Sequence, residues 1–197
     1  MVDYITYEAP AWNQIYEMLF EQSEKISKNG YQPDIIVGIA RGGMVPASIL
    51  SDLLGVRQVT VIKIEFYEDI AKPSAQPVIT QFLSVAVNGK KILLVDDVAD
   101  SGQSLKIARQ YLIESGAVEV KIATLYAKAT AQIMPDFVEK ITKHWIVFPW
   151  EIKETLQSIL QKQKDKQIIN NNEFVKLLKA GLPKQFLEQI LKTLPES

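Results

Sequence analysis

An acidic pair followed by a loop of small polar residues is the part of this sequence best suited to chemistry. Asp96 and Asp97 end the apolar run 92–95, and residues 100–104 then lead into a helical pattern. Small residues let successive backbone N–H groups converge on an anion, and the start of the next helix adds its positive dipole end. The two carboxylates need donors between them and the anion, and the hydroxyls of a ribose supply these. The spacing therefore predicts a sugar-phosphate site rather than helix-capping acids at a strand end.

A second loop of small residues, 38–43, is suited to another phosphate group. Gly42 and Gly43 let the main chain approach an anion, and Arg41 offers a planar guanidinium that matches phosphate oxygens. A diglycine turn with an arginine is by itself most often only a turn, and the sugar-phosphate string is what favours a phosphate loop here. Neither the P-loop pattern nor the dinucleotide-binding glycine pattern can be fitted to the chain.

The elements that position these loops alternate between strands and helices. The short apolar runs are 35–40, 59–64, 92–95, 120–126 and 145–148. The helical patterns are 11–28, 45–54 and 101–114. Nearly uninterrupted apolar runs are typical of strands covered on both faces, so we expect an α/β fold with an open, mainly parallel sheet flanked by helices. Ligands of such sheets bind at the carboxyl ends of the strands, where both loops fall.

The last quarter of the chain differs in character. After Glu151 the sequence is rich in helix formers, and we expect three short helices that pack together and onto the sheet domain. Asn172 is expected to cap the second helix and Pro183 to open the third. We predict a first domain of residues 1–151 and a small C-terminal helical bundle of residues 152–197.

Composition excludes several classes of function. The 22 Lys and Arg residues nearly balance the 23 Asp and Glu residues, so we expect neither nucleic acid nor a membrane as partner. Without cysteine and with one histidine, the chain has only carboxylates as plausible metal ligands. No window approaches the roughly 18 apolar residues of a membrane span, and the first residues do not resemble a signal peptide. We expect a cytoplasmic protein.

The string 91–105 resembles the binding motif of the type I phosphoribosyltransferases: an apolar strand, two acidic residues, a few variable residues, then Ser/Thr-Gly-x-Ser/Thr. The resemblance implies that Asp96 and Asp97 contact the ribose of 5-phosphoribosyl pyrophosphate (PRPP). The implied 5′-phosphate loop comprises Asp100, Ser101, Gly102, Gln103 and Ser104. The implied pyrophosphate loop comprises Ala40, Arg41, Gly42 and Gly43, with a cis peptide bond between the first two.

Residues 124–151 resemble the base-binding part of the 6-oxopurine branch of this family and its archaeal relatives. The resemblance implies that Lys128 faces the 6-position of a purine. It also implies that Trp145 stacks on the base and that the backbone of Ile146 meets its pyrimidine edge.

Three residues are expected to take part in catalysis. Asp100 matches the aspartate that takes or shares the proton at purine N7, and Arg41 would neutralise the leaving pyrophosphate. Tyr67 opens the segment 67–81, which we predict to be a long loop followed by an extra strand or hairpin. That loop matches the mobile hood of the family, which closes over the reacting centre and excludes water.

The resemblance predicts a purine phosphoribosyltransferase, an enzyme of purine salvage, that forms a homodimer. It implies Mg²⁺ as cofactor, with Asp96, Asp97 and Glu151 as candidate protein ligands.

The base is left open by two departures from the family pattern. Relatives commonly read Lys-Pro-Trp where this chain has Lys128, Ala129 and Thr130, and the helical tail is not part of the minimal enzyme. Because some archaeal adenine-using enzymes are similar to offshoots of this branch, adenine is narrowly favoured over hypoxanthine, guanine or xanthine. An alternative of another class is a non-catalytic regulator that senses PRPP or a nucleotide.

Overall fold

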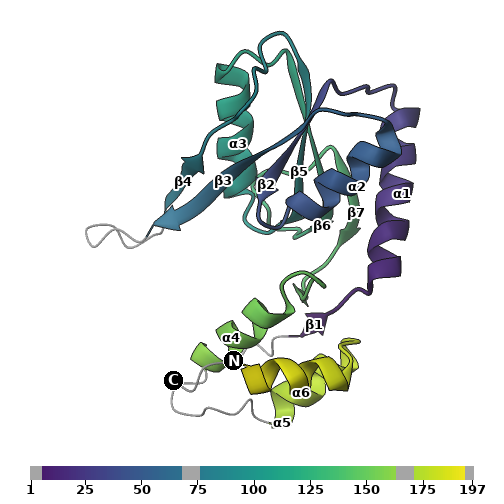
Figure 1. Cartoon of the computed structure of the whole chain (residues 1–197), viewed down its shortest axis with the longest axis vertical. Coiled ribbons are helices and arrows are strands. Elements are labelled where there is room, and N and C mark those ends of the chain that lie inside the picture. The colour runs from purple at the N-terminus through teal and green to yellow at the C-terminus, as the bar shows by residue number, and fades with distance from the viewer. Residues whose placement is uncertain (1–5, 68–75, 163–170, 194–197) are drawn as a thin grey trace. The chain divides into compact units, whose positions relative to one another are not determined.

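The computed structural model describes residues 6–67, 76–162 and 171–193. These residues fall into two compact units (Figure 1). The larger unit is Tyr16–Lys143, and the smaller combines Met1–Ile15 with His144–Ser197. Among the helices that the structure describes, none is long and apolar enough to cross a lipid bilayer.

The larger unit is built on a six-stranded sheet with the strand order β4-β3-β2-β5-β6-β7 (Figure 1). Its strands are β2 (Ile35–Ala40), β3 (Val59–Tyr67), β4 (Gln76–Gln81), β5 (Lys91–Ala99), β6 (Glu119–Ala127) and β7 (Phe137–Ile141). Every neighbouring pair is parallel except β3 and β4, which are antiparallel. The predicted open, mainly parallel α/β sheet is therefore confirmed, and β4 is the expected extra strand after the long loop.

The fifth apolar run is the one that does not join this sheet. Within 145–148 only β8 (Trp145–Ile146) is a strand, and it pairs with β1 (Tyr7–Glu8) in a separate two-stranded sheet. The sixth strand of the main sheet is instead β7, whose sequence FVEKI carries two charged residues and was not predicted. As an edge strand it has only one neighbour, so its pattern is less apolar than that of a central strand.

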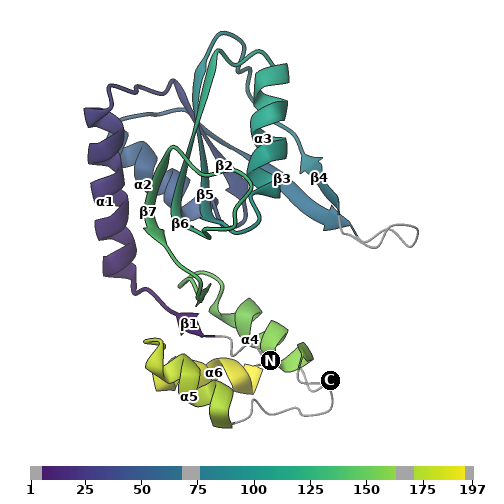
Figure 2. The ribbon, with the colours of Figure 1, turned by 180° about the vertical axis from the view of Figure 1, so that it is seen from behind.

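Helices cover both faces of the sheet, as Figures 1 and 2 show. They are α1 (Trp12–Lys28), α2 (Met44–Leu54) and α3 (Gln103–Glu114), each within two residues of its expected start. Leu105, Ala108 and Leu112 of α3 pack into one core cluster with strand residues such as Val37 and Leu94. Most of α1, together with α2, lies on the opposite face.

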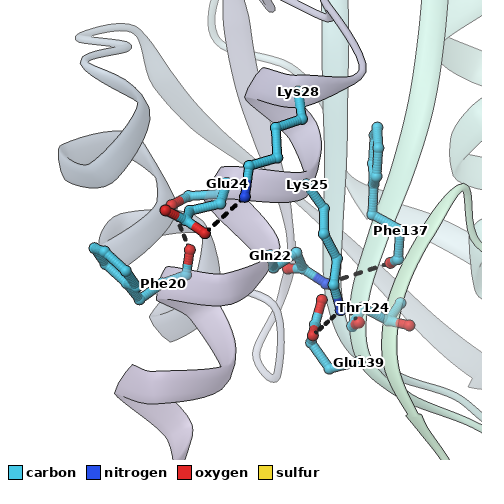
Figure 3. A network of polar contacts seen from close by, with 9 residues as sticks. Phe20, Gln22, Glu24, Lys25, Lys28, Thr124, Phe137 and Glu139 are labelled. Atoms are coloured by element: carbon cyan, nitrogen blue, oxygen red, sulfur yellow. Dashed lines mark hydrogen bonds and ion pairs between the residues drawn. The ribbon is translucent and has the colours of Figure 1, made fainter.

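Buried polar contacts hold α1 against β6 and β7 (Figure 3). The side-chain amide of Gln22 donates to the carbonyl oxygens of Thr124, at 2.8 Å, and Phe137, at 3.3 Å. One turn later, Lys25 forms an ion pair with Glu139, whose side chain is only 3% exposed. This side of the sheet is therefore locked to the helix by specific bonds as well as by apolar packing.

The smaller unit contains β1, β8 and the three helices that the sequence predicted. The helices are α4 (Ile152–Lys162), α5 (Asn171–Lys179) and α6 (Lys184–Thr193). They share an apolar cluster that includes Val147, Leu156, Ile159, Leu177, Leu182 and Leu187. The contacts group the chain differently from the predicted domains 1–151 and 152–197, because β1 pairs with β8, and Tyr7 of β1 and Val147, just after β8, belong to this cluster.

The two predicted helix starts in this unit have different outcomes. Pro183 directly precedes α6, and its carbonyl accepts the N–H groups of Phe186 and Leu187, as expected for the residue that opens a helix. Helix α5 begins at Asn171, so Asn172 lies inside the first turn and not at the cap position that was predicted for it.

Candidate active site

The acidic pair lies at the carboxyl end of β5, near the middle of the main sheet. Asp96 is half-buried, and Asp97 is only 7% exposed. The backbone N–H of Asp97 donates to Oδ1 of Asp96 at 3.0 Å. The two carboxylates are thus held by the strand itself, where the sequence placed them.

The predicted 5′-phosphate loop connects β5 to α3. Gly102 stands at the N-terminal cap of α3 with a φ of 77°, a left-handed conformation that favours glycine. The hydroxyl of Ser101 accepts the N–H of Gln103 at 3.3 Å, and both Asp100 and Ser101 are exposed. Glycine at the cap has no side-chain oxygen, so it leaves the start of the helix suited to an external anion.

The loop that follows β6 is hydrogen-bonded to the predicted 5′-phosphate loop and supports it. The N–H of Gln132 donates to the carbonyl of Ser101, and the N–H of Lys128 to that of Ala99, both at 2.9 Å. A Cβ atom at Gly102 would lie 2.9 Å from the backbone nitrogen of Ile133. Sequence reasoning missed this brace, because it consists of main-chain contacts that leave no side-chain signal beyond the glycine.

The predicted pyrophosphate loop begins where β2 ends. The peptide bond between Ala40 and Arg41 is cis, as the resemblance implies, and Arg41 is exposed. Gly43 donates its N–H to the carbonyl of Ile39 at 2.8 Å, which closes the turn into α2.

The predicted pyrophosphate loop is in direct contact with the acidic pair of β5 through Gly42 and Asp97. A Cβ atom at residue 42 would lie 2.5 Å from Cγ and 2.7 Å from Oδ1 of Asp97. At residue 43 a Cβ atom would collide with the carbonyl oxygen of Val95. Both glycines thus allow close approach to β5, and the fold brings the predicted ribose-binding and pyrophosphate-binding motifs together.

Two further predicted site residues of the larger unit lie at the carboxyl ends of strands, at the same edge of the sheet as the acidic pair. Lys128 comes directly after β6 and is half-buried. Tyr67 is the last residue of β3 and is paired with Gln76 of β4. Residues 68–75 of the predicted hood, between Tyr67 and Gln76, lie outside the described residues, and so does the side chain of Tyr67.

The predicted base-stacking residue belongs to the smaller unit. Trp145 is 45% exposed on β8, whereas Ile146 is buried. The N–H groups of Trp145 and Val147 donate to the carbonyls of Thr6, just before β1, and Glu8, on β1. Because alternate residues of a strand direct their polar main-chain groups to opposite sides, the N–H and C=O of Ile146 point away from β1. That orientation agrees with the predicted main-chain contact, which stays a prediction.

Glu151, the third candidate metal ligand, lies at the start of α4. Its carbonyl accepts the N–H of Thr155, and its carboxylate receives a long hydrogen bond of 3.5 Å from the N–H of Phe148. Within residues 6–67, 76–162 and 171–193, no group of three or more His, Asp or Glu side chains is arranged to hold a metal ion.

The two motifs and their contact agree with the result of a search against protein families. The model of the phosphoribosyl transferase domain matches residues 11–155. The chain belongs to the type I phosphoribosyltransferase family. The match ends in the first turn of α4, so α5 and α6 of this phosphoribosyltransferase lie outside it.

Relatives from bacteria and archaea place the phosphoribosyltransferase in the purine branch. A xanthine-guanine phosphoribosyltransferase of Cereibacter sphaeroides is 30% identical over 149 residues, which cover 72% of this chain and 85% of that protein. Another, of Nitratidesulfovibrio vulgaris, is 31% identical over 142 residues, with coverages of 71% and 82%. The crystal structure of a purine phosphoribosyltransferase from Pyrococcus horikoshii Ot3 is 36% identical, with a TM-score of 0.68, and the similarity covers 74% of this chain and 94% of that one.

Proposed function

We propose that this phosphoribosyltransferase joins a 6-oxopurine base to the ribosyl 5-phosphate of PRPP and releases pyrophosphate. The observation that carries the proposal is the contact between Gly42 and the carboxylate of Asp97. It brings a loop suited to pyrophosphate beside a carboxylate suited to ribose hydroxyls. A substrate that bears a phosphate at each end of a ribose matches such a pair of loops.

The 6-oxopurine replaces the narrow initial preference for adenine. The two relatives described above are named for xanthine and guanine, and neither is named for adenine. The preference for adenine rested on the departures at Ala129, Thr130 and the helical tail, together with a similarity to archaeal adenine-using enzymes, and not on a contact to a 6-amino group. Lys128, by contrast, carries a donor that a 6-oxo group accepts.

The proposed reaction breaks the bond between C1′ and the pyrophosphate oxygen and forms a bond between C1′ and N9 of the base. The proton that the base loses, at N7, passes to the carboxylate of Asp100. Arg41 binds the departing pyrophosphate, while Trp145 and Ile146 hold the base. Most of the rate in such a reaction comes from positioning and from stabilisation of charge.

The acidic pair suits Mg²⁺, which we propose as the cofactor. Mg²⁺ prefers oxygen ligands and usually keeps only one or two carboxylates besides waters and substrate phosphates. Asp96 and Asp97 offer such oxygens, and the absence of a Cβ atom at residue 42 lets the carboxylate of Asp97 lie against the predicted pyrophosphate loop. When bound there with the substrate, the ion supplies positive charge that offsets the charge of the pyrophosphate.

The proposal is tested by incubating the purified full chain with PRPP, Mg²⁺ and one purine at a time. We expect nucleotide and pyrophosphate from xanthine, guanine or hypoxanthine, and little product from adenine. Product from adenine alone would refute the assignment of the base. A protein that forms no nucleotide from any of the four would not be a purine phosphoribosyltransferase. The predicted homodimer would appear in light scattering as twice the 22.2 kDa chain.

The role of Asp100 is tested by Asp100→Asn, which keeps the size of the side chain but removes its ability to take a proton. We expect kcat to fall by about 10²- to 10⁴-fold, the usual contribution of a general base, with a much smaller change in the KM for PRPP. The matched control is Asp52→Asn, the same change at an exposed position of α2. A near-normal kcat for Asp100→Asn would show that another group takes the proton.

A further inference from the structure

Helices α5 and α6 lie beyond the family match, yet their contacts lead to the strand that carries Trp145 and Ile146. We infer that helix α5 positions β8 for the base, acting through β1, and that Tyr7 and Glu173 are the positioning residues. This inference rests on the proposed function, in which β8 contacts the purine.

The first step is that β8 depends on β1. The two strands form a parallel pair in which Tyr7 is opposite Trp145 and Glu8 is opposite Ile146. The N–H of Trp145 donates to Thr6 at 2.9 Å, which is one of the bonds that hold the pair together. A two-stranded sheet is marginally stable by itself in water, so the position of β8 follows whatever holds β1.

The second step is that α5 and the turn after it hold β1. The hydroxyl of Tyr7 donates to Oε2 of Glu173 on α5 at 2.6 Å. The N–H of Ala9 donates to the carbonyl of Ala180 at 3.2 Å. A Cβ atom at Gly181 would touch the carbonyl oxygen of Ala9 at 3.2 Å, so the two main chains lie against each other. The tail therefore anchors β1 at both of its ends.

Apolar packing joins the same elements. Tyr7 and Ala9 pack against the buried cluster that Val147, just after β8, shares with Leu177 of α5 and Leu187 of α6. Residues two apart on a strand face the same side, so Tyr7 and Ala9 present one face of β1 to the helices. Paired positions of neighbouring strands also share a face, which places Trp145 one strand spacing, about 4.8 Å, from Tyr7.

The third step concerns charge, which strengthens the hydrogen bond between Tyr7 and Glu173. Lys176 lies 2.6 Å from Oε1 of Glu173, so each carboxylate oxygen has a donor. Burial tends to raise the pKa of Glu173, but the bonds from Lys176 and Tyr7 outweigh it and lower that pKa below its ordinary value. Burial, and then the neighbouring Glu173, raise the pKa of Tyr7. The acceptor thus stays charged and the donor stays protonated at working pH, and such charge-assisted hydrogen bonds are the strong ones.

The experiment compares Tyr7→Phe and Glu173→Gln with the wild type in the full chain. Tyr7→Phe removes the hydroxyl but keeps the packed ring, and Glu173→Gln keeps an acceptor but removes its charge. We expect the KM for the purine base to rise by roughly three- to tenfold, because small displacements of a positioning group are costly. The KM for PRPP should stay within about twofold, because both phosphate loops lie in the larger unit.

The matched control is Glu188→Gln, the same substitution in α6 at an exposed ion pair with Lys184. We expect its kinetics to equal those of the wild type. The double variant Tyr7→Phe with Glu173→Gln should raise the KM for the base no further than the stronger single variant, because both changes act on the same hydrogen bond.

Two results would overturn the inference. One is a KM for the base that Tyr7→Phe and Glu173→Gln both leave unchanged in an active enzyme. The other is an equal rise in both KM values, which would indicate general destabilisation and not positioning of the base. A wild type that is inactive with all four purines would remove the proposed function, and this inference with it.

Discussion

Substitution of Gly42 by alanine is the most direct test of how the two substrate loops are joined. The backbone of Gly42 does not have a positive φ, so alanine fits its conformation without strain. The three atoms nearest to the new methyl group all belong to the carboxylate of Asp97. The variant therefore acts first on the contact between the pyrophosphate loop and Asp97.

The size of the effect follows from the geometry. An ordinary contact of a Cβ atom begins at 3.4 Å, whereas Cγ of Asp97 lies 2.5 Å from the added atom, so the carboxylate must retreat by about 0.9 Å, the difference of these distances. Because Asp97 is only 7% exposed, it has little open space to move into. Overpacking of this kind costs about 1–3 kcal/mol of stability. A misplacement near 1 Å costs about 100-fold in rate, or about 2.7 kcal/mol in the barrier.

The assay is steady-state kinetics with varied PRPP, together with urea unfolding. We expect kcat/KM for PRPP to fall about 100-fold in Gly42→Ala. Gly89→Ala is the control, since position 89 has open space but a φ of +71°, so it should lose about 1 kcal/mol of stability and keep wild-type kinetics. Adding Asp97→Ala to Gly42→Ala removes the obstacle and should restore stability without activity. A kcat/KM for Gly42→Ala within about threefold of the wild type would refute the reasoning.

Two further predictions concern the stability of the larger unit. Lys25→Met removes the cation that pairs with the buried carboxylate of Glu139, whose Oε1 has no hydrogen-bond partner among the described residues. We expect the free energy of unfolding, measured with urea, to fall by about 2 kcal/mol. The same change at Lys28, whose pair with Glu24 is exposed, should cost less than about 0.5 kcal/mol, and equal losses would contradict the role of burial. Tyr31 donates to the carbonyl of Ile92 at 2.7 Å, and burial, followed by the charge of Glu119, raises its pKa above the ordinary value near 10. The folded protein thus holds the hydroxyl proton of Tyr31 more tightly than the unfolded chain, so the free energy of unfolding should fall as pH rises above about 10. Tyr31→Phe should reduce that fall, and it should cost about 1 kcal/mol of stability at neutral pH because the hydrogen bond is lost. Urea unfolding at about pH 8 and about pH 10.5 measures both effects, and an undiminished alkaline loss in Tyr31→Phe would contradict the assignment.

Local sequence sets the conformation of the two predicted substrate-binding segments, 96–104 and 40–43. Glycines, small residues and strand ends determine their backbone, and each of these acts over only a few residues. Each loop could therefore be recognised before the fold was known. The central strands were equally readable, because a strand covered on both faces must be apolar along its whole length.

The edge elements were not readable in this way. The strand β7 is short and partly charged, and β1 and β8 have two residues each, too few for a periodic pattern. Their existence depends on partners far away in the chain. The run 145–148 was expected to resemble the other apolar runs, but its neighbour is β1, some 140 positions earlier.

The base was the other limit. Ala129 and Thr130 differ from the family pattern, which left the base open, and a similarity to archaeal adenine-using enzymes favoured adenine narrowly, whereas the relatives are named for xanthine and guanine. A departure from a motif shows that a contact has changed, but it does not show which atom of the ligand is recognised.

The sequence by itself predicted one loop suited to a ribose phosphate and one suited to pyrophosphate, because both signals are local. Only the tertiary structure decided that Gly42 lies against Asp97, that residues 128–133 brace the phosphate loop, and that Tyr7 is held by Glu173. These contacts join residues between 29 and 166 positions apart, most of them through main-chain atoms or close approach. Main-chain groups are the same in every residue, so only the folded chain reveals which of them meet.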